Sequence, residues 1–343
     1  MNTSNSKITG PRDQLKRPLR DLRISLLDQC NFRCTYCMPI KKYHKNYQFL
    51  SKNQRLDHDE IVRLVGILVP MGVSKIRLTG GEPLLDKNIT RLIESINNIQ
   101  GIDDLALTTN ASLLKDKAKS LAKAGLNRIT ISLDSINQDV FFKMNGNRGK
   151  VSEVMQGIEA AENAGLLPIK INTVVQRGVN DHSVLDLLAH FRGTGHIVRL
   201  IEFMDVGTQN NWNRDSVVTA NELLSMIENK WPVSPIEKTY KGEVAKRYVY
   251  DDGAGEIGFI TSVSKPFCGD CSRARLSADG VLYTCLFASQ GADIKSLLRS
   301  GASDEEIESE FTRIWLSRND RYSEQRSGSV AKTQKIEMYR MGG

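Results

Sequence analysis

The six cysteines of this 343-residue chain form two separate groups of three, and this grouping limits what the chain can build. The groups are spaced C-x3-C-x2-C and C-x2-C-x13-C, with their members at Cys30, Cys34, Cys37, Cys268, Cys271 and Cys285. A [4Fe-4S] cluster that is fully held by protein takes four thiolates. Each triad would therefore leave one iron open to a small molecule, as in reactive metal sites and unlike closed structural ones.

Disulfide bonds and zinc are the other uses of such cysteines. The chain opens with a polar stretch that lacks the apolar region of a signal peptide, and no apolar run is long enough to span a bilayer. We therefore expect a reducing, cytoplasmic location and free thiols. The uneven spacing of the first triad, whose nearest histidine is His44, favours iron-sulfur over zinc. For the second triad, spacing alone leaves both metals open.

The net charge of +7 favours an acidic partner, but nucleic acid is a poor candidate. Beyond the first two dozen positions the basic residues form no dense run, and only 6% of residues are aromatic. A nucleic-acid module usually shows a basic stripe or aromatic residues for base stacking. We expect neither a nucleic-acid nor a membrane partner.

Short apolar runs rich in β-branched residues alternate with helical patterns and predict an α/β fold. The expected strands are residues 21–27, 75–79, 105–109, 128–133, 169–175 and 197–203. The expected helices between them are residues 59–69, 87–97, 115–123, 151–163 and 184–190. Successive strand-helix units imply a parallel sheet with right-handed crossovers. We predict an incomplete, three-quarter parallel β/α barrel.

The pattern changes after about residue 215. Two Asp-Gly turns, Asp252-Gly253 and Asp279-Gly280, lie between runs of β-forming residues and predict antiparallel hairpins, and a last helix is expected over residues 304–316. We predict a flexible N-terminal tail (1–18), a partial barrel (19–215), a C-terminal α+β extension that carries the hairpins and the second triad (216–327), and a C-terminal tail (328–343) that ends Gly-Gly.

Four cations lie inside the expected strands, where an unpaired charge in an apolar core would cost several kcal/mol. They are Arg23, Arg77, Lys170 and Arg199. A salt bridge to a neighbouring strand explains any one of them, but the strands contain few acidic residues to match all four. The pattern favours a barrel lumen that holds a polyanion such as a triphosphate. Polar residues also follow the strand ends, where parallel sheets gather functional groups.

Several motifs together carry a family resemblance. They are the first triad with Tyr36 and Met38-Pro39, the run Thr79-Gly80-Gly81-Glu82-Pro83, the second triad continued by Ser-Arg273-Ala-Arg275, the stretch RLIEFMDVG at 199–207 and the terminal Gly342-Gly343. The chain resembles the radical S-adenosylmethionine (SAM) superfamily and, within it, the molybdenum cofactor biosynthesis protein A family of GTP 3′,8-cyclases. The resemblance covers nearly the whole chain after the N-terminal tail.

The resemblance implies two [4Fe-4S] clusters, one on each triad, with SAM on the open iron of the first and the guanine of GTP on that of the second. It implies that SAM is bound by Tyr36, Gly81, Ser132 and Met204, and GTP by Arg23, Arg77, Thr108, Lys170, Arg199, Arg273 and Arg275. It implies that Gly342 and Gly343 reach into the barrel mouth and assist catalysis.

The implied reaction is the conversion of GTP to 3′,8-cyclo-7,8-dihydro-GTP, the first step of molybdenum cofactor biosynthesis. Implied partners are a reductant such as flavodoxin or ferredoxin, a downstream pterin-forming enzyme and a second copy of the chain in a homodimer. Asp86-Lys87 and Ala111 depart from the family pattern, which often has an arginine and a glycine there. The alternatives are a radical SAM peptide maturase with an auxiliary cluster and a basic, zinc-dependent nucleic-acid-binding protein.

Overall fold

The computed structural model describes residues 10–240, 242–326 and 335–342, and within them one open sheet of twelve strands is the central feature. The strand order is β12-β11-β10-β1-β2-β3-β4-β5-β6-β9-β8-β7. The six central strands are β1 (Asp21–Ser25), β2 (Lys75–Thr79), β3 (Asp104–Thr109), β4 (Arg128–Ser132), β5 (Lys170–Val175) and β6 (Ile197–Glu202). All five pairings among them are parallel, which confirms the predicted partial barrel.

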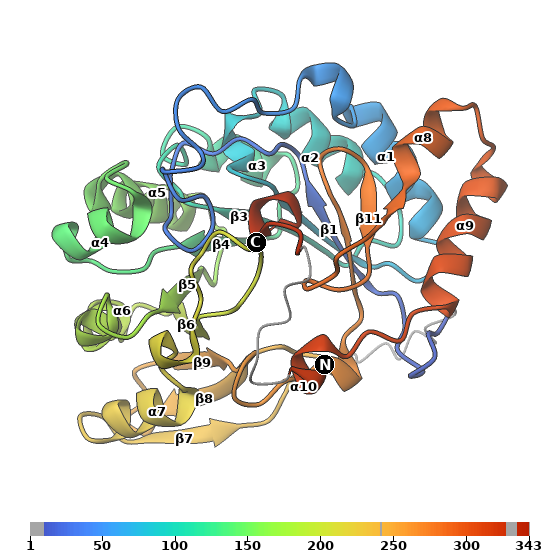
Figure 1. The fold of residues 1–343 in the computed structure, drawn as a ribbon. Helices are drawn as coiled ribbons and strands as arrows, with labels where there is room; N and C mark the ends of the chain where they lie inside the picture. Colours follow the sequence, from blue (N-terminus) through green and yellow to red (C-terminus); the bar gives the residue numbers. More distant parts are fainter. Residues whose placement is uncertain (1–9, 241, 327–334, 343) are drawn as a thin grey trace.

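Helices follow the central strands and cover the outer face of the sheet (Figure 1). They are α1 (His58–Leu68), α2 (Ile89–Asn97), α3 (Ala118–Lys123), α4 (Gln138–Asn145), α5 (Val151–Asn163) and α6 (Val184–Phe191). α1 begins at a capping box, in which Asp57 accepts from the Glu60 amide and Glu60 accepts from the Asp57 amide. The apolar sides of these helices and of the strands form one continuous core of buried Leu, Ile and Val side chains.

The C-terminal part adds strands to both edges of the parallel sheet. β8 (Lys246–Tyr250) and β9 (Glu256–Ile260) form one predicted hairpin, and β10 (Arg273–Leu276) and β11 (Val281–Tyr283) form the other. β9 pairs in parallel with β6, and β10 pairs in parallel with β1. The two hairpins therefore extend opposite edges of the barrel, an arrangement that the sequence analysis did not predict.

The outermost strands are β7 (Val233–Ile236), which pairs with β8, and β12 (Ala292–Asp293), which pairs with β11. The remaining helices are α7 (Ala220–Glu228), α8 (Ile294–Arg299), α9 (Asp304–Leu316) and α10 (Tyr322–Gln325). α9 has the predicted bounds and lies against α1, where the Arg63 guanidinium pairs with the Asp304 carboxylate at 2.8 Å. None of the helices described between residues 10 and 342 combines the length and apolarity that a membrane crossing requires.

Both chain ends pack against the body of the protein as far as they are described. Residues 10–18 were expected to belong to a flexible tail, but Asp13 and Arg17 are only 5% and 2% exposed, because they join a buried ion-pair network. The flexible-tail prediction is therefore wrong for residues 10–18. Near the other end, Met338, Tyr339 and Met341 are buried, and the last described turn lies near the middle of the sheet in the view of Figure 1. Residues 1–9 and 327–334 lie outside the described residues.

Candidate functional site

The two cysteine triads, which are more than two hundred residues apart in sequence, line one cavity of about 260 Å³. The first triad lies on the loop that follows β1, and the second lies on the segment before β10 and after β11. Because β10 pairs in parallel with β1, both segments reach the same mouth of the barrel. All six cysteines are free thiols and are partly buried.

Glycine is required where the loop after β2 meets the first triad. A Cβ on Gly81 would lie 2.0 Å from the Gln29 carbonyl oxygen, and a Cβ on Gly80 would lie 2.6 Å from the Leu27 oxygen. The backbone hydrogen bonds Gly81 N to Leu27 O (2.7 Å) and Glu82 N to Gln29 O (2.8 Å) hold the two loops together. Gly81, expected to contact SAM, thus lies beside the first triad and lines the cavity.

Two buried carboxylates lie on the first-triad side of the cavity. Glu82 accepts from Thr109 Oγ1 (2.7 Å) and from the Asn110 amide (2.8 Å), and burial raises its pKa to about 7. Asp134 accepts from the Tyr36 hydroxyl (2.9 Å) and from the Val174 amide (2.9 Å), and burial raises its pKa to about 6. Neither carboxylate was among the predicted site residues.

The other residues expected at SAM line the same cavity. Tyr36 is held by Asp134, and Ser132 at the end of β4 pairs in register with Asn172 on β5. Met204, just after β6, packs in an apolar cluster with Tyr36. The cavity therefore brings all four predicted SAM residues together with the first triad.

The second triad lies in a more positive environment than the first. Burial raises the pKa of Cys30 to about 12, and the Glu82 carboxylate adds to this shift. Burial would also raise the pKa of Cys271, but the charges of Arg273, Arg318 and Arg275 and a backbone hydrogen bond together outweigh it and lower the pKa to about 6. Arg273 Nη2 lies 3.2 Å from Cys271 Sγ, and the Nε of the buried Arg275 has no hydrogen-bond partner in the described structure. Both predicted arginines therefore face the cavity beside the second triad.

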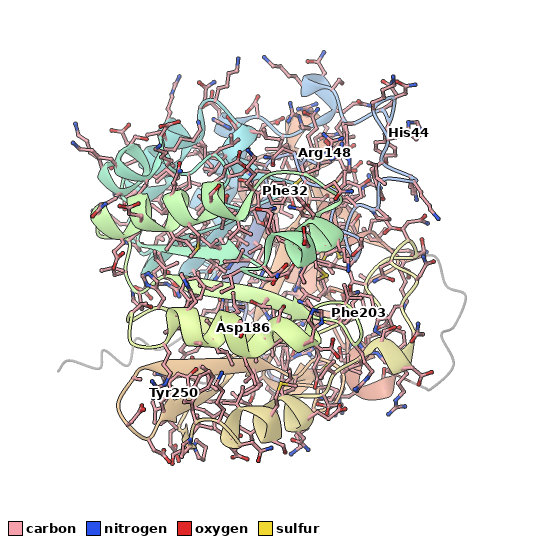
Figure 2. The ribbon with its side chains drawn as sticks, turned by 90° about the vertical axis from the view of Figure 1, so that its left-hand side faces the viewer. Phe32, His44, Arg148, Asp186, Phe203 and Tyr250 are labelled. Carbon is pink, nitrogen blue, oxygen red and sulfur yellow. The ribbon has the colours of Figure 1, made fainter. Side chains whose placement is uncertain are left out.

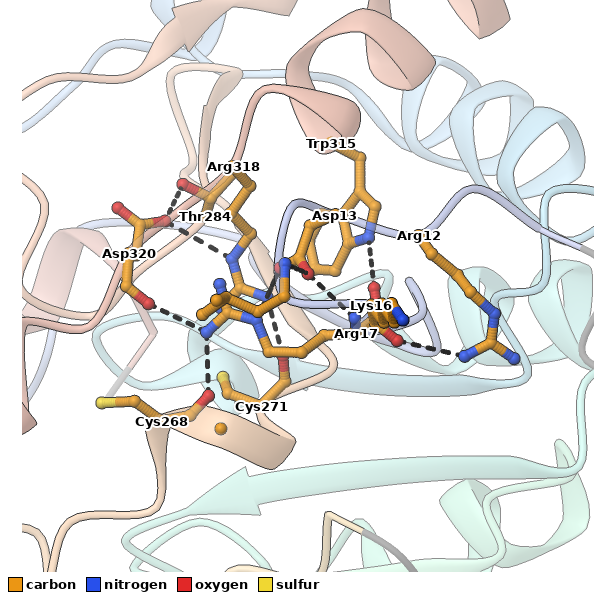
Figure 3. A network of polar contacts seen from close by, with 12 residues as sticks. Arg12, Asp13, Lys16, Arg17, Cys268, Cys271, Thr284, Trp315, Arg318 and Asp320 are labelled. Carbon is orange, nitrogen blue, oxygen red and sulfur yellow. Dashed lines mark hydrogen bonds and ion pairs between the residues drawn. The ribbon is translucent and has the colours of Figure 1, made fainter.

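Two buried arginines hold the backbone of the second triad from behind (Figure 3). Arg17 Nη1 donates to the Cys268 carbonyl oxygen at 2.8 Å, and Arg318 Nη1 donates to the Cys271 carbonyl oxygen at 2.7 Å. The Asp13 carboxylate pairs with both guanidinium groups, at 2.5 Å and 3.2 Å. This support gives no signal in the sequence, because it joins three segments that are far apart in the chain.

The predicted lumen cations lie on the inner face of the barrel. Arg275, Arg23 and Arg77 occupy the same register row on β10, β1 and β2. Arg77 Nη1 donates to Thr108 Oγ1 (3.0 Å) and Thr130 Oγ1 (3.1 Å), so Thr108 positions a cation as well as lining the cavity.

Lys170 and Arg199 complete the set on the opposite side of the lumen. Lys170 pairs in register with Thr130, and Arg199 Nε donates to Asn172 Oδ1 at 2.9 Å. Burial, with the repulsion of neighbouring cations, lowers the pKa of Lys170 to about 8 and that of Arg199 to about 9. The protein groups around the lumen therefore do not fully stabilise its positive charges. A bound polyanion would supply the missing negative charge.

A second, smaller cavity of about 120 Å³ continues from the first toward the amino ends of the strands, and Arg23, Thr108 and Arg273 line both. Lys75 and Arg128 also line it, and neither was predicted. Lys75 could have been found, because it precedes Arg77 by two positions and therefore shares its face of β2. Both residues neighbour the Asp104 carboxylate, which forms a salt bridge with Arg128 and lies 3.9 Å from Lys75 Nζ.

The C-terminal residues lie at the mouth. Gly342 has a φ of 73°, and a Cβ there would lie 2.3 Å from Thr79 Cγ2. Ser25 Oγ lies 3.2 Å from the Arg340 carbonyl oxygen, and Tyr339 lines the larger cavity. The described tail thus covers the carboxyl ends of β1 and β2, while Gly343 lies outside the described residues.

The two departures from the family pattern have local explanations. Ala111 has a φ of 61°, a left-handed conformation that favours glycine, and its methyl group is fully buried. Asp86 accepts a hydrogen bond from His58 Nε2 at 2.8 Å. Burial would raise the pKa of Asp86, but the His58 hydrogen bond, the Asn88 amide and the charges of His58 and Arg55 together outweigh it, and the net shift is downward.

The donor sets fit iron-sulfur clusters. Across the described ranges, no three His, Cys, Asp or Glu side chains are grouped closely enough to hold a single metal ion. A cubane takes one cysteine per iron, so its ligands lie farther apart than those of one zinc ion. Three free thiols that line one side of a cavity match such a larger group.

Comparisons with known proteins identify the family of this chain. Residues 24–191 match the Radical SAM superfamily, and residues 196–324 match Molybdenum Cofactor Synthesis C. The GTP 3′,8-cyclase of Xanthomonas axonopodis pv. citri is 51% identical over 337 residues, which cover 98% of this chain and 100% of that protein. The GTP 3′,8-cyclase of Staphylococcus epidermidis is 47% identical over 336 residues, which cover 97% of this chain and 98% of that protein.

Among solved structures, the crystal structure of Streptococcus suis SuiB bound to S-adenosylmethionine superposes with a TM-score of 0.59 at 15% identity. The match covers 85% of this chain and 67% of that one, and it concerns the fold. The sequence matches, by contrast, extend over nearly the full length of this chain and its relatives. The chain therefore belongs to the GTP 3′,8-cyclase family of the radical SAM superfamily.

Proposed function

We propose that this protein is a GTP 3′,8-cyclase, which converts GTP to 3′,8-cyclo-7,8-dihydro-GTP at the start of molybdenum cofactor biosynthesis. The observation that carries the proposal is the joining of both cysteine triads and the cationic lumen in connected cavities. Near-complete alignment with GTP 3′,8-cyclases supports the same conclusion.

Residues 19–215 would hold SAM and the first cluster, and residues 216–327 would hold the second. When bound, the first cluster and SAM would supply the radical chemistry of hydrogen abstraction from GTP, and the second cluster would supply an open iron for the guanine. Cys30, Cys34 and Cys37 would hold the first group, and Cys268, Cys271 and Cys285 the second. Tyr36, Gly81, Ser132 and Met204 would orient SAM beside the first triad.

The lumen cations would fix GTP by its triphosphate. The inner wall of the barrel carries Arg23, Arg77, Lys170 and Arg199. The negative charge of a nucleoside triphosphate would neutralise these four cations. Arg273 and Arg275 would hold the nucleotide at the second triad. Held at both ends, the ribose would lie between the triads, with one C-H bond presented for attack and water excluded.

The described C-terminal residues would close the mouth over this site. Tyr339 lines the cavity and Gly342 packs on Thr79, and these contacts support a catalytic role for the terminal glycines. We also propose a reducing cytoplasmic location, in keeping with six free thiols, an external reductant such as flavodoxin or ferredoxin, a downstream pterin-forming enzyme and a homodimer.

The test is anaerobic reconstitution followed by reaction with dithionite, SAM and each nucleoside triphosphate. We expect about eight irons per chain. Of the nucleoside triphosphates, only GTP should give both 5′-deoxyadenosine and the cyclised product. Arg77→Met, which removes a lumen cation and keeps the side-chain length, should raise the KM for GTP while iron content and SAM binding stay unchanged. Zinc in place of iron, or cyclisation that ignores the identity of the nucleotide, would contradict the proposal.

A further inference from the structure

The loop that follows the first triad carries unneutralised positive charge. Residues 38–56 contain no Asp or Glu, and Lys41, Lys42 and Lys45 are exposed. In the described part of the chain, none of these three lysines forms an ion pair with a carboxylate. Ile40, beside them, is 48% exposed. The loop thus combines charge with an apolar contact point, as protein interfaces do.

A second loop adds to this charge. Arg148 is exposed on the turn after α4, and Asn145 fixes that turn by accepting from the Arg148 amide at 2.9 Å. The Asn145 carbonyl oxygen in turn accepts from the amide of Arg33, between two cysteines of the first triad, at 2.9 Å. Figure 2 shows Arg148 and His44 on the same side of the molecule. We call Lys41, Lys42, Lys45 and Arg148 the basic rim.

The basic rim is attached directly to the first triad. Arg33 donates to the carbonyl oxygens of both Tyr43 and Cys30, each at 2.6 Å. Tyr43 belongs to a buried aromatic cluster against which Cys30 and Cys37 pack. Its ring lies 5.1 Å from that of Tyr339, which lines the cavity. Lysines of the rim flank Tyr43 in sequence, so the rim is the surface immediately outside the first cluster site.

We propose that the basic rim is the docking surface for a small acidic protein that carries a one-electron reductant. The inference rests on the proposed function, because that chemistry needs one electron from outside for each radical formed. The donor would be oxidised by one electron, and the cluster at the first triad would be reduced by one. Electron tunnelling falls steeply with distance, so the donor must bind at the surface nearest that cluster. A positive rim attracts an acidic donor and orients it on approach.

The test compares two charge-reversal variants of equal net charge. Lys41→Glu/Lys45→Glu changes the rim, and Lys119→Glu/Lys123→Glu changes two exposed lysines on α3 by the same amount. Each protein is assayed for GTP cyclisation with dithionite, a small chemical reductant, and with reduced flavodoxin as the acidic donor. Flavodoxin binding is measured separately by calorimetry at low and high salt, and this readout does not depend on turnover.

We expect the rim variant to keep its dithionite-driven rate and to lose at least about tenfold of its flavodoxin-driven rate at low salt. Its flavodoxin affinity should fall in parallel, while the α3 variant should match the unmodified protein. Equal flavodoxin rates and affinities in both variants would overturn the proposal, as would the absence of measurable flavodoxin binding by the unmodified protein. Failure of all proteins to cyclise GTP with dithionite would instead refute the proposed function, and the binding measurement would still test the rim.

Discussion

Replacing the Asp13 carboxylate by an amide should strongly destabilise the protein, because this buried carboxylate neutralises two buried arginines. The side chains of Asp13, Arg17 and Arg318 are 0%, 2% and 1% exposed. Asp13 Oδ1 also accepts from the amides of Leu15 (3.0 Å) and Arg17 (2.8 Å), and the amide oxygen of asparagine can keep these two bonds. Asp13→Asn therefore removes the charge and the two hydrogen bonds that Asp13 Oδ2 accepts from Arg17 Nε and Arg318 Nη1.

The size of the effect follows from the partners that remain. Breaking one side of a buried ion pair costs roughly 3–5 kcal/mol, because a charge stays buried without compensation. Asp320 offsets part of this cost for Arg318, since its carboxylate lies 3.4 Å from Arg318 Nε, but it is 30% exposed and forms no salt bridge with Arg17. We therefore expect a loss near the lower end, about 3 kcal/mol of unfolding free energy.

Anaerobic urea unfolding followed by tryptophan fluorescence measures this loss. Trp315 is a local probe, because its indole Nε1 donates to the Arg17 carbonyl oxygen at 3.0 Å and Arg318 lies over its ring. The matched control is Glu310→Gln, which removes one carboxylate from an ion pair whose arginine, Arg313, is 68% exposed. Loss of an exposed ion pair of this kind should lower the free energy of unfolding by less than about 0.5 kcal/mol.

Asp13→Asn should lower the iron content of the second triad and leave that of the first triad unchanged. Arg17 and Arg318 donate to the carbonyl oxygens of Cys268 and Cys271, so a disturbed network shifts two of the three ligands. Iron content should fall from about eight toward about four per chain. A destabilisation no larger than that of the control would refute the energetic argument, and loss of iron from the first triad would refute the positional one.

Three further outcomes are expected. Deletion of Gly342 and Gly343 should abolish cyclisation while SAM binding, measured by equilibrium dialysis, survives; full activity of the truncated protein would contradict the role of the tail. Lys170, whose pKa is about 8 in the free protein, should take up about half a proton when GTP binds at pH 8, so GTP affinity should fall as pH rises above 8. Calorimetry in two buffers should detect this uptake and its loss in Lys170→Arg. Gly157→Ala should destabilise α5, because the new Cβ would lie 2.5 Å from a backbone oxygen, whereas Gly66→Ala in α1, with nothing within 4 Å, should stabilise by about 1 kcal/mol in thermal unfolding.

Elements with local signals were predictable from sequence. The strand at 75–79 and the helices at 151–163 and 304–316 have the expected bounds, because alternation, periodicity and the Ser303 cap act over a few residues. α7 was missed although Thr219 and Glu222 form a capping box that reading of the sequence could have found. α4 begins at an Asn137 cap and ends at Gly146, a weaker signal.

Long-range pairing was not predictable in the same way. The hairpin turns indicate that β8 pairs with β9 and β10 with β11, but nothing local indicates that β9 joins β6 or that β10 joins β1. The cationic strand residues did predict the character of the lumen, because a charge inside an apolar run requires a partner. Asp13 and Arg318 gave no such signal, since each is an ordinary polar residue until the fold buries it.

The pairing of β1 with β10 sets an order of events during synthesis. Asp21 on β1 accepts from Ser272 Oγ at 2.6 Å, and these residues are 251 positions apart. Ribosomes add about 5–20 residues per second, so this edge of the sheet has no partner for on the order of ten to fifty seconds after it emerges. An unpaired edge strand invites pairing with other chains. The nascent protein therefore depends on protection of β1 until its last third has been translated.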